Sequence, residues 1–311
     1  MSGRQTFRDM IAANKRNSLL LMLLMFAFFL VLGGVLGGGF LAPPDRIGDG
    51  VTMGLVAGAV AAAIYGLIGW YGGSGVLMAF HGARKIEKRD HPQLFNVVEE
   101  ISIAAGLPMP NIYIMDEAAP NAFATGTSPE SASVAITTGL LAKLDRDELQ
   151  GVIAHEMGHI RNFDIRYSML MAMLAGGLVM LSEVLLRASL FRSNRRSSNN
   201  RNSGQLQLVL MIVGIVLAIL APILAALIQL AMSRQREYLA DASAVEFTRN
   251  PEGLAGALAK LAGDKTPMEC SKATESMFIV SPKVGLRCGA DDLFSTHPPI
   301  KERIQRLMAL R

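Results

Sequence analysis

Two long uncharged runs dominate the pattern at the start of the chain. Leu19–Phe40 and Val51–Tyr71 contain no Asp, Glu, Lys or Arg. A helix rises about 1.5 Å per residue, so either run is long enough to cross a hydrocarbon layer about 30 Å thick. The second run is rich in Gly and Ala, which is typical of helices that pack closely in a membrane. We therefore predict two transmembrane helices within residues 1–71.

Two further apolar runs lie later in the chain. Tyr167–Ser182 is marginal as a membrane span, because charged residues follow it closely. Leu208–Ile228 is longer and uncharged. The linker between them, residues 191–205, contains four arginines. We predict a transmembrane hairpin over residues 166–232.

The segments between the apolar runs have the patterns of a water-soluble α+β domain. Pro92–Ala105 has apolar residues at helical spacing and is followed by Gly106, which predicts a half-buried helix. The short β-branched segments NIYIM and SVAITT predict strands at residues 111–115 and 133–138. Further helices are expected at residues 233–247, at 251–262 and from about 300 onward.

Charge and composition narrow the class of protein. The net charge is +4, but basic residues cluster beside the apolar runs rather than along one face, so we expect no nucleic acid partner. Positive charge next to a membrane span favours the cytoplasmic side. The position of these basic residues therefore places the N-terminus and everything from about Gly72 in the cytoplasm, in contact with the lipid bilayer. The two cysteines, Cys270 and Cys288, have no metal-binding spacing and are expected to be reduced thiols.

The segment GVIAHEMGHIRN carries the candidate chemistry. Asp145 and Glu148 have capping-box spacing, so a helix should begin near Arg146 and include this segment. His155 and His159, four residues apart on that helix, can share one metal ion, and Glu156 can reach a metal-bound water. Zinc suits two imidazoles and lowers the pKa of bound water to about 7.

A catalytic zinc usually takes three protein ligands. The spacing of a metzincin would require Gly at 162 and His at 165, but the sequence has Asn162 and Ile165. Glu237 in REYLAD is the candidate third ligand, and Asp241, one turn later, can accept a hydrogen bond from a ligand histidine. We expect one Zn²⁺ per chain, although the residues alone do not distinguish zinc from other divalent ions.

The metal ion that these residues are predicted to share constrains the membrane topology. His155 and Glu237 must lie on one side of the membrane, so the chain between them crosses an even number of times. We therefore expect the two later runs either both to cross or both to stay on the cytoplasmic side. Crossing is favoured by the length of Leu208–Ile228, although the basic linker is then external. A reporter at Asn199 that behaves as cytoplasmic would contradict four spans.

The chain resembles the HtpX-type membrane zinc metallopeptidases, which are related to the prenyl-protein-processing membrane metalloproteases. The resemblance covers the two N-terminal runs, NAFATG, HEMGH, EYLAD and STHPPIKER, in this order. It implies zinc bound by His155, His159 and Glu237, Glu156 as general base, and Asp241 supporting a ligand. It also implies an endopeptidase at the cytoplasmic face of the bacterial inner membrane that cleaves misfolded or damaged membrane proteins under stress.

The resemblance implies further site residues. The NAFATG segment is expected to form the edge strand that pairs with the substrate backbone, through the residues Asn121, Ala122, Phe123 and Ala124. His297 and Arg303 in STHPPIKER are expected near the reacting carbonyl, where either can stabilise the oxyanion. The alternatives are a plain structural strand and a His-Pro-Pro turn that only starts a helix.

The expected fold is a four-helix membrane anchor with a cytoplasmic α+β zincin-like domain assembled from residues 72–165 and 233–311. Three other functions stay open. A processing peptidase for lipidated substrates would have the same site inside a bounded chamber. An inactive relative would serve as a scaffold, although it would not need Glu156. A transporter would need ionisable groups within the spans. Natural substrates, cleavage preference and oligomeric state are left undetermined by the sequence.

Overall fold

The computed structural model describes residues 7–40, 46–174, 176–177, 212, 215–216, 234–264, 266–268, 274, 277–279 and 298–310. The chain divides into two compact units. The α/β unit is drawn from Met1–Asn17, Gly72–Met169 and Ile228–Arg311, and the long-helix unit from Ser18–Tyr71 and Leu170–Leu227. The arginine linker, residues 191–205, and His297 lie outside the described residues, as does most of the predicted hairpin.

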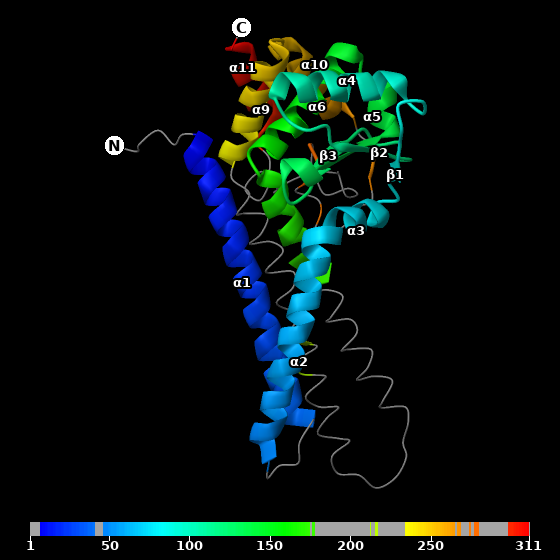
Figure 1. Ribbon diagram of the computed structural model, residues 1–311. Helices are drawn as coiled ribbons and strands as arrows, with labels where there is room; N and C mark the ends of the chain where they lie inside the picture. Colours follow the sequence, from blue (N-terminus) through cyan, green and yellow to red (C-terminus); the bar gives the residue numbers. More distant parts are fainter. Residues whose placement is uncertain are drawn as a thin grey trace, which may run out of the picture. The chain divides into compact units, whose positions relative to one another are not determined.

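The long-helix unit contains most of α1 (Phe7–Phe40) and all of α2 (Ile47–Leu67), which lie side by side (Figure 1). The buried residues of α2 recur at every fourth position: Gly50, Gly54, Gly58 and Ala62. A Cβ atom on Gly54 would lie 2.0 Å from the carbonyl oxygen of Gly33 in α1. The two backbones therefore approach as closely as they do because no side chain separates them.

Both predicted N-terminal spans are helices with outward-facing apolar side chains. Among the described residues, Ile11–Gly37 and Ile47–Phe80 are long and apolar enough to cross a membrane. Few residues of either stretch are buried, and Leu24, for example, is 63% exposed. The second helix continues beyond the predicted end at Tyr71, through a π-helical turn (Ile68–Gly72) and α3 (Gly73–Phe80). It continues because residues 76–80 are apolar and no proline interrupts them.

The α/β unit contains a four-stranded sheet in the order β1-β2-β4-β3. Strands β2 and β4 are parallel, and Ile112 lies opposite Val134. The other two pairs, β1 with β2 and β3 with β4, are antiparallel. Strand β3 therefore lies at one edge of the sheet. The strands are β1 (Arg84–Lys85), β2 (Asn111–Met115), β3 (Ala122–Thr125) and β4 (Ser133–Thr137).

The helix boundaries of this unit follow local signals in the sequence. Helix α4 ends at Gly106, which has a φ of 66°, and α6 begins after a capping box formed by Asp145 and Glu148. Both boundaries confirm the sequence prediction. The helices are α4 (Pro92–Ala105), α5 (Thr138–Lys143), α6 (Arg146–Arg161), α9 (Arg234–Thr248), α10 (Pro251–Gly263) and α11 (Ile300–Met308).

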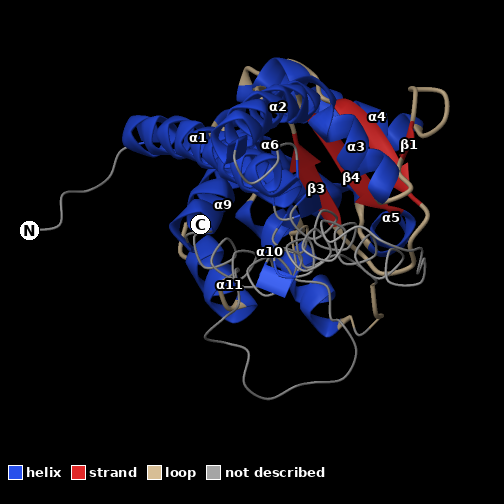
Figure 2. Cartoon of the chain, turned by 90° about the horizontal axis from the view of Figure 1, so that it is seen from below, coloured by secondary structure: helices blue, strands red, loops and turns tan. Residues whose placement is uncertain are grey.

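Helix α6 lies at the centre of the α/β unit and packs against α4, α9, α10 and β3. Figure 2 shows the strands on one side of it and α9, α10 and α11 on the other. A Cβ atom on Gly158 would lie 3.0 Å from Cβ of Ser243 and 3.1 Å from Cα of Ala240. Helix α9 can therefore lie close to the HEMGH segment, and this contact brings Glu237 to the histidines.

Candidate metal centre and active site

The structure brings the three predicted metal ligands together. One ligand atom from each of His155, His159 and Glu237 lies within 4.8 Å of the others. The Nε2 atoms of the histidines are 3.2 Å apart, and each lies 3.6 Å from a Glu237 carboxylate oxygen. His155 is fully buried and Glu237 nearly so. The three groups converge on one point, as a shared ion requires.

The first histidine is held by Asp241 and Arg303. Nδ1 of His155 lies 3.0 Å from Oδ1 of Asp241. Arg303 donates to both oxygens of the same carboxylate, from Nε to Oδ2 at 2.9 Å and from Nη2 to Oδ1 at 2.7 Å. Arg303 is completely buried. Asp241 thus lies where the sequence predicts a partner for a ligand histidine, and a fork-shaped pair orients it.

The second histidine has its own carboxylate partner, Asp164, which was not among the residues predicted from the sequence. Nδ1 of His159 lies 3.0 Å from Oδ2 of Asp164. The side chain of Asn14, in α1, donates to Oδ1 of Asp164 at 2.6 Å and to the carbonyl of Asn162 at 2.9 Å. Asp164 could have been predicted as a partner of His159, because it is an acidic residue only five positions later. Nothing in the sequence connects Asn14 with it.

The donor set fits a divalent cation. Each Nδ1 faces a carboxylate, so we assign the N–H to that nitrogen and the lone pair to Nε2. Two Nε2 lone pairs and a carboxylate then point at one place, which favours a positive charge there. Burial opposes charge on His159, but Asp164 and Glu237 outweigh it and raise its pKa to about 9, whereas burial lowers the pKa of His155 to about 4. A proton or a metal ion can supply the charge.

Glu156 lies beside the three ligands and beside the edge strand. It is 1% exposed, and its carboxylate accepts a hydrogen bond from the backbone of Ala124. Burial raises the pKa of Glu156 to about 7, and the charge of Glu237 adds to this while His159 opposes it. A carboxyl group with a pKa near neutrality can both accept and return a proton.

The other predicted site residues do not all lie at the centre. Ala122 and Ala124 lie in β3, as expected for an edge strand, and Ala124 lines the small cavity at Glu156. The ring of Phe123 packs instead against His81 and Phe278, and Asn121 precedes the strand and accepts the N–H of Ala122. Of the two expected oxyanion groups, His297 is not described. Arg303 has its third nitrogen, Nη1, 3.3 Å from Glu237 Oε2.

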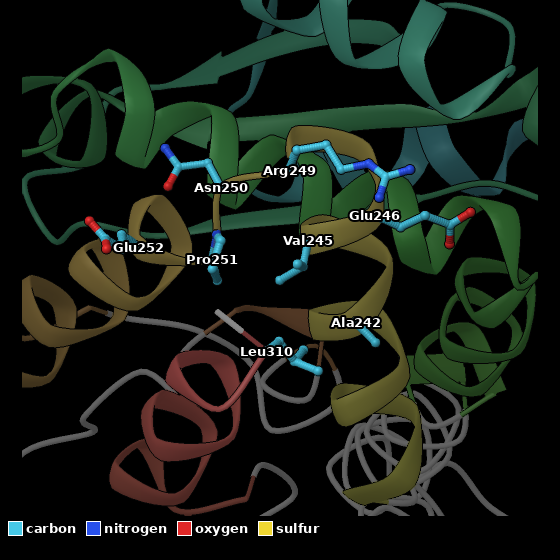
Figure 3. Close-up of a pocket in the computed structure, with 8 residues that line it drawn as sticks. All are labelled: Ala242, Val245, Glu246, Arg249, Asn250, Pro251, Glu252 and Leu310. Atoms are coloured by element: carbon cyan, nitrogen blue, oxygen red, sulfur yellow. The ribbon is translucent and has the colours of Figure 1, made fainter.

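The cavity at this centre is smaller than another cavity in the same unit. The cavity lined by Glu156, His159 and Glu237 has a volume of about 20 Å³. A roomier cavity of about 580 Å³ lies between α9, the start of α10 and Leu310 (Figure 3). Its polar lining consists of Glu246, Arg249, Asn250 and Glu252, without a histidine or cysteine. We locate the site at the smaller cavity, because among the residues that the structure describes it is there that metal-ligating groups converge.

The fold and this centre define a membrane-associated metallopeptidase. A family model for peptidase family M48 matches residues 88–311, and the chain belongs to that family. It is 44% identical over 306 residues to a protease HtpX homolog of Listeria monocytogenes serotype 4a (strain HCC23), covering 96% of this chain and 98% of the relative. A homolog from Streptococcus thermophilus (strain CNRZ 1066) is 45% identical over 305 residues, with the same coverage.

A comparison with solved structures finds the crystal structure of S. mikatae Ste24p. The match has a TM-score of 0.46 and 20% sequence identity, and it covers 96% of this chain and 66% of that one. Together, the family match and the two relatives confirm the predicted enzyme class, a metalloprotease, and the resemblance on which it was based.

Proposed function

We propose that this protein is a zinc-dependent endopeptidase that hydrolyses misfolded or damaged membrane proteins at the cytoplasmic face of the bacterial inner membrane. The observation that carries the proposal is the convergence of His155, His159 and Glu237 beside the buried carboxyl group of Glu156. Two imidazoles and one carboxylate form a donor set suited to catalytic zinc, which keeps one position open.

Each residue of the centre has a separate role in the proposed reaction. His155, His159 and Glu237 would hold the ion, which when bound polarises a peptide carbonyl and lowers the pKa of a water molecule. Glu156 accepts the proton of the attacking water and returns it to the leaving amine. Its raised pKa suits both transfers. Asp241 and Asp164 fix the tautomer and orientation of the histidines.

The oxyanion would be held by the ion, with a contribution from His297 or from Arg303. The guanidinium of Arg303 is already engaged, because Nε and Nη2 both donate to Asp241 and Nη1 lies 3.3 Å from Oε2 of Glu237. We therefore assign Arg303 mainly as a positioning residue, which acts on His155 through Asp241. Its fixed charge beside Glu237 also favours the ionised carboxylate that a metal ligand requires.

Substrate binding is proposed at the edge strand β3. An extended polypeptide that pairs with this edge gains main-chain hydrogen bonds with little dependence on sequence, as the degradation of varied damaged proteins requires. Ala122 and Ala124 are the residues whose backbone would make these contacts.

The proposed topology has four spans and both termini in the cytoplasm. The basic residues next to the two N-terminal spans support this orientation, because positive charge favours the cytoplasmic side. Residues 72–165 and 233–311 would form one cytoplasmic domain, and residues 166–232 a transmembrane hairpin. A reporter fused at Asn199 should therefore behave as external.

The direct test uses the full chain purified in detergent with a chelator. Zinc is then restored to the wild type and to Glu156→Gln, and cleavage of casein and of the chain itself is followed by gel electrophoresis. We expect cleavage only by the wild type, with equal zinc content in both proteins. If neither protein cleaves although each binds one zinc, the hydrolytic role of this centre is wrong and a scaffold function is favoured.

A further inference from the structure

A short segment of the chain lies on the open edge of β3. The backbone N–H of Ile279 donates to the carbonyl oxygen of Ala122 at 3.0 Å. The carbonyl oxygen of Ile279 accepts a hydrogen bond from Nη1 of Arg303 at 3.3 Å. That same nitrogen lies 3.3 Å from the carboxylate of Glu237, a proposed metal ligand. The backbone of Ile279 therefore connects the edge strand with the centre, as the backbone of a substrate would.

The preceding side chain fills an aromatic pocket. The ring of Phe278 is 5.1 Å from that of Phe123 and 5.4 Å from that of His81, and both contacts are edge-to-face. Phe278 is 1% exposed. Burial lowers the pKa of His81, so its ring is neutral at neutral pH. Phe278 thus lies between two uncharged rings, one from the edge strand and one from the residue after α3.

This segment leaves no room for a peptide at the centre. Met277, Phe278 and Ile279 line the small cavity together with Glu156, His159 and Glu237. The volume of that cavity, about 20 Å³, is close to what one water molecule needs. A polypeptide can reach Glu156 along β3 only by taking the place of Met277–Ile279.

We propose that Met277–Ile279 is an internal ligand of the substrate groove, and that His81 and Phe123 form a subsite for an aromatic side chain of the substrate. The subsite holds Phe278 until a substrate displaces it. The groove therefore accepts extended polypeptides with a phenylalanine, tyrosine or tryptophan, side chains that are abundant in exposed membrane segments and in unfolded chains. This inference rests on the proposed function, because it assigns the groove to a peptide.

Two sequence-independent contacts and one selective contact follow from this arrangement. The hydrogen bonds to Ala122 and Arg303 involve only the backbone, so they are available to any substrate residue. The contact of Phe278 with His81 and Phe123 depends on the side chain, and edge-to-face aromatic pairs stabilise binding beyond the burial of area alone. Preference should therefore be concentrated at one substrate position.

The experiment measures peptide binding without hydrolysis. All proteins are full-length, zinc-loaded and carry Glu156→Gln, which leaves the ligands in place. The probe is a short fluorescein-labelled peptide with a single phenylalanine among alanines and serines, compared with the same peptide with serine in that position. The variants are Phe278→Ser, Phe278→Ser with His81→Ala, and Phe95→Ser as a control for the loss of a phenylalanine from α4.

Weakening the internal ligand should raise the population of the open groove. We expect Phe278→Ser to bind both peptides at least about threefold more tightly than the parent does, because apparent affinity scales with the binding-competent fraction. Within Phe278→Ser, the phenylalanine peptide should bind up to about tenfold more tightly than the serine peptide. Adding His81→Ala should reduce that ratio, and Phe95→Ser should leave both affinities at the parent values.

Two results would overturn the inference. Unchanged affinity in a folded, zinc-loaded Phe278→Ser protein would show that Met277–Ile279 does not compete for the groove. Equal affinity for the two peptides would show that the aromatic pocket is not a subsite. If Phe278→Ser does not fold, Phe278→Leu keeps the apolar volume and should give a smaller gain in the same direction. Because binding is measured without hydrolysis, failure here is distinguishable from failure of the proposed peptidase activity.

Discussion

The two units of this protein differ in which chemical groups they bury and which they expose. In the long-helix unit, α1 and α2 meet through glycine backbones, while large apolar side chains such as those of Leu24 and Val56 face outward. In the α/β unit, apolar side chains form the interior, yet charged groups such as Arg303 and Asp241 are also buried there. The first arrangement suits a hydrocarbon solvent, and the second is costly unless every charge has a partner.

The difference shows where each unit is sensitive to substitution. The close contact between the backbones of α1 and α2 is disrupted when a single methyl group is added, because no side chain between the helices can move aside. A cluster of buried charges is destabilised when one member is removed, because the remaining charges are then buried without a partner of opposite charge. The helix α1 contributes to both units, with residues before Ser18 in one and later residues in the other. The following predictions test this contrast.

The largest effect is expected for Arg303→Met. The substitution leaves the carboxylates of Asp241 and Glu237 buried without their shared cation, so we expect the free energy of unfolding to fall by about 3–5 kcal/mol. Zinc affinity should fall at least about tenfold, because Asp241 no longer holds His155 firmly. Urea unfolding in detergent, followed by circular dichroism, and zinc titration measure the two effects.

Arg306→Met is the matched control on the same helix. Arg306 pairs with Glu302 at 2.9 Å on the exposed face of α11, where its side chain is 57% exposed. Loss of an exposed pair costs at most about 1 kcal/mol. Equal destabilisation by the two variants would contradict the role assigned to buried charge.

The next effect concerns the glycine contact. Gly54→Ala would place a Cβ atom 2.0 Å from the carbonyl oxygen of Gly33, so α1 and α2 must separate. We expect a loss of about 1–3 kcal/mol in the stability of this helix pair, which is the usual cost of overpacking. The fraction folded during a titration with sodium dodecyl sulfate measures it. Gly48→Ala is the control, because a Cβ atom there would meet nothing within 4 Å.

A smaller effect is expected for Asn14→Ala, in the part of α1 that belongs to the α/β unit. The variant loses both hydrogen bonds that hold Asp164 and the end of α6, at 2.6 and 2.9 Å. His159 is then less well oriented, and zinc affinity should fall by roughly tenfold, the lower end for groups that support a ligand. The spectrum of the cobalt-substituted protein should shift as well. Asn17→Ala, one turn later, should leave zinc affinity and spectrum unchanged.

How much of this could be predicted from the sequence depends on the distance over which each signal acts. The start of α6 follows from Asp145 and Glu148, which lie three residues apart, and the helical spacing of His155 and His159 is equally local. Glu237 is remote in sequence, but the need for a third ligand and the nearby Asp241 made it the predicted candidate. Local geometry and coordination chemistry were therefore sufficient to predict that His155, His159 and Glu237 lie close together, as they do in the structure.

The features that the sequence did not reveal are tertiary contacts without a pattern of their own. Arg303 was expected near the substrate, but only packing places its guanidinium on Asp241. Phe278 belongs to a stretch without helical or strand periodicity, so its position between His81 and Phe123 had no signal. Asn14 lies in the polar start of a long helix, and its contact with Asp164 spans 150 residues.

The smallest predicted effect sharpens the contrast between buried and surface charge. Lys143, at the end of α5, donates to Asp264, and the backbone N–H of Thr266 donates to the same carboxylate; together they lower the pKa of Asp264 to about 2. A lowered carboxyl pKa stabilises the folded state above the ordinary pKa of about 3.9, and the benefit is lost as the pH falls toward 2. Because the pair lies at the surface, the gain at pH 7 should be under about 1 kcal/mol.

The measurement compares the wild type with Asp264→Asn in urea unfolding at a series of pH values. The wild type should be slightly more stable from neutral pH down to about pH 4, and the two curves should converge at about pH 2. Raised salt should shrink the difference as well, since exposed charges are screened. A difference that persisted unchanged at the lowest pH and in high salt would mean that Asp264 acts through its neutral contacts.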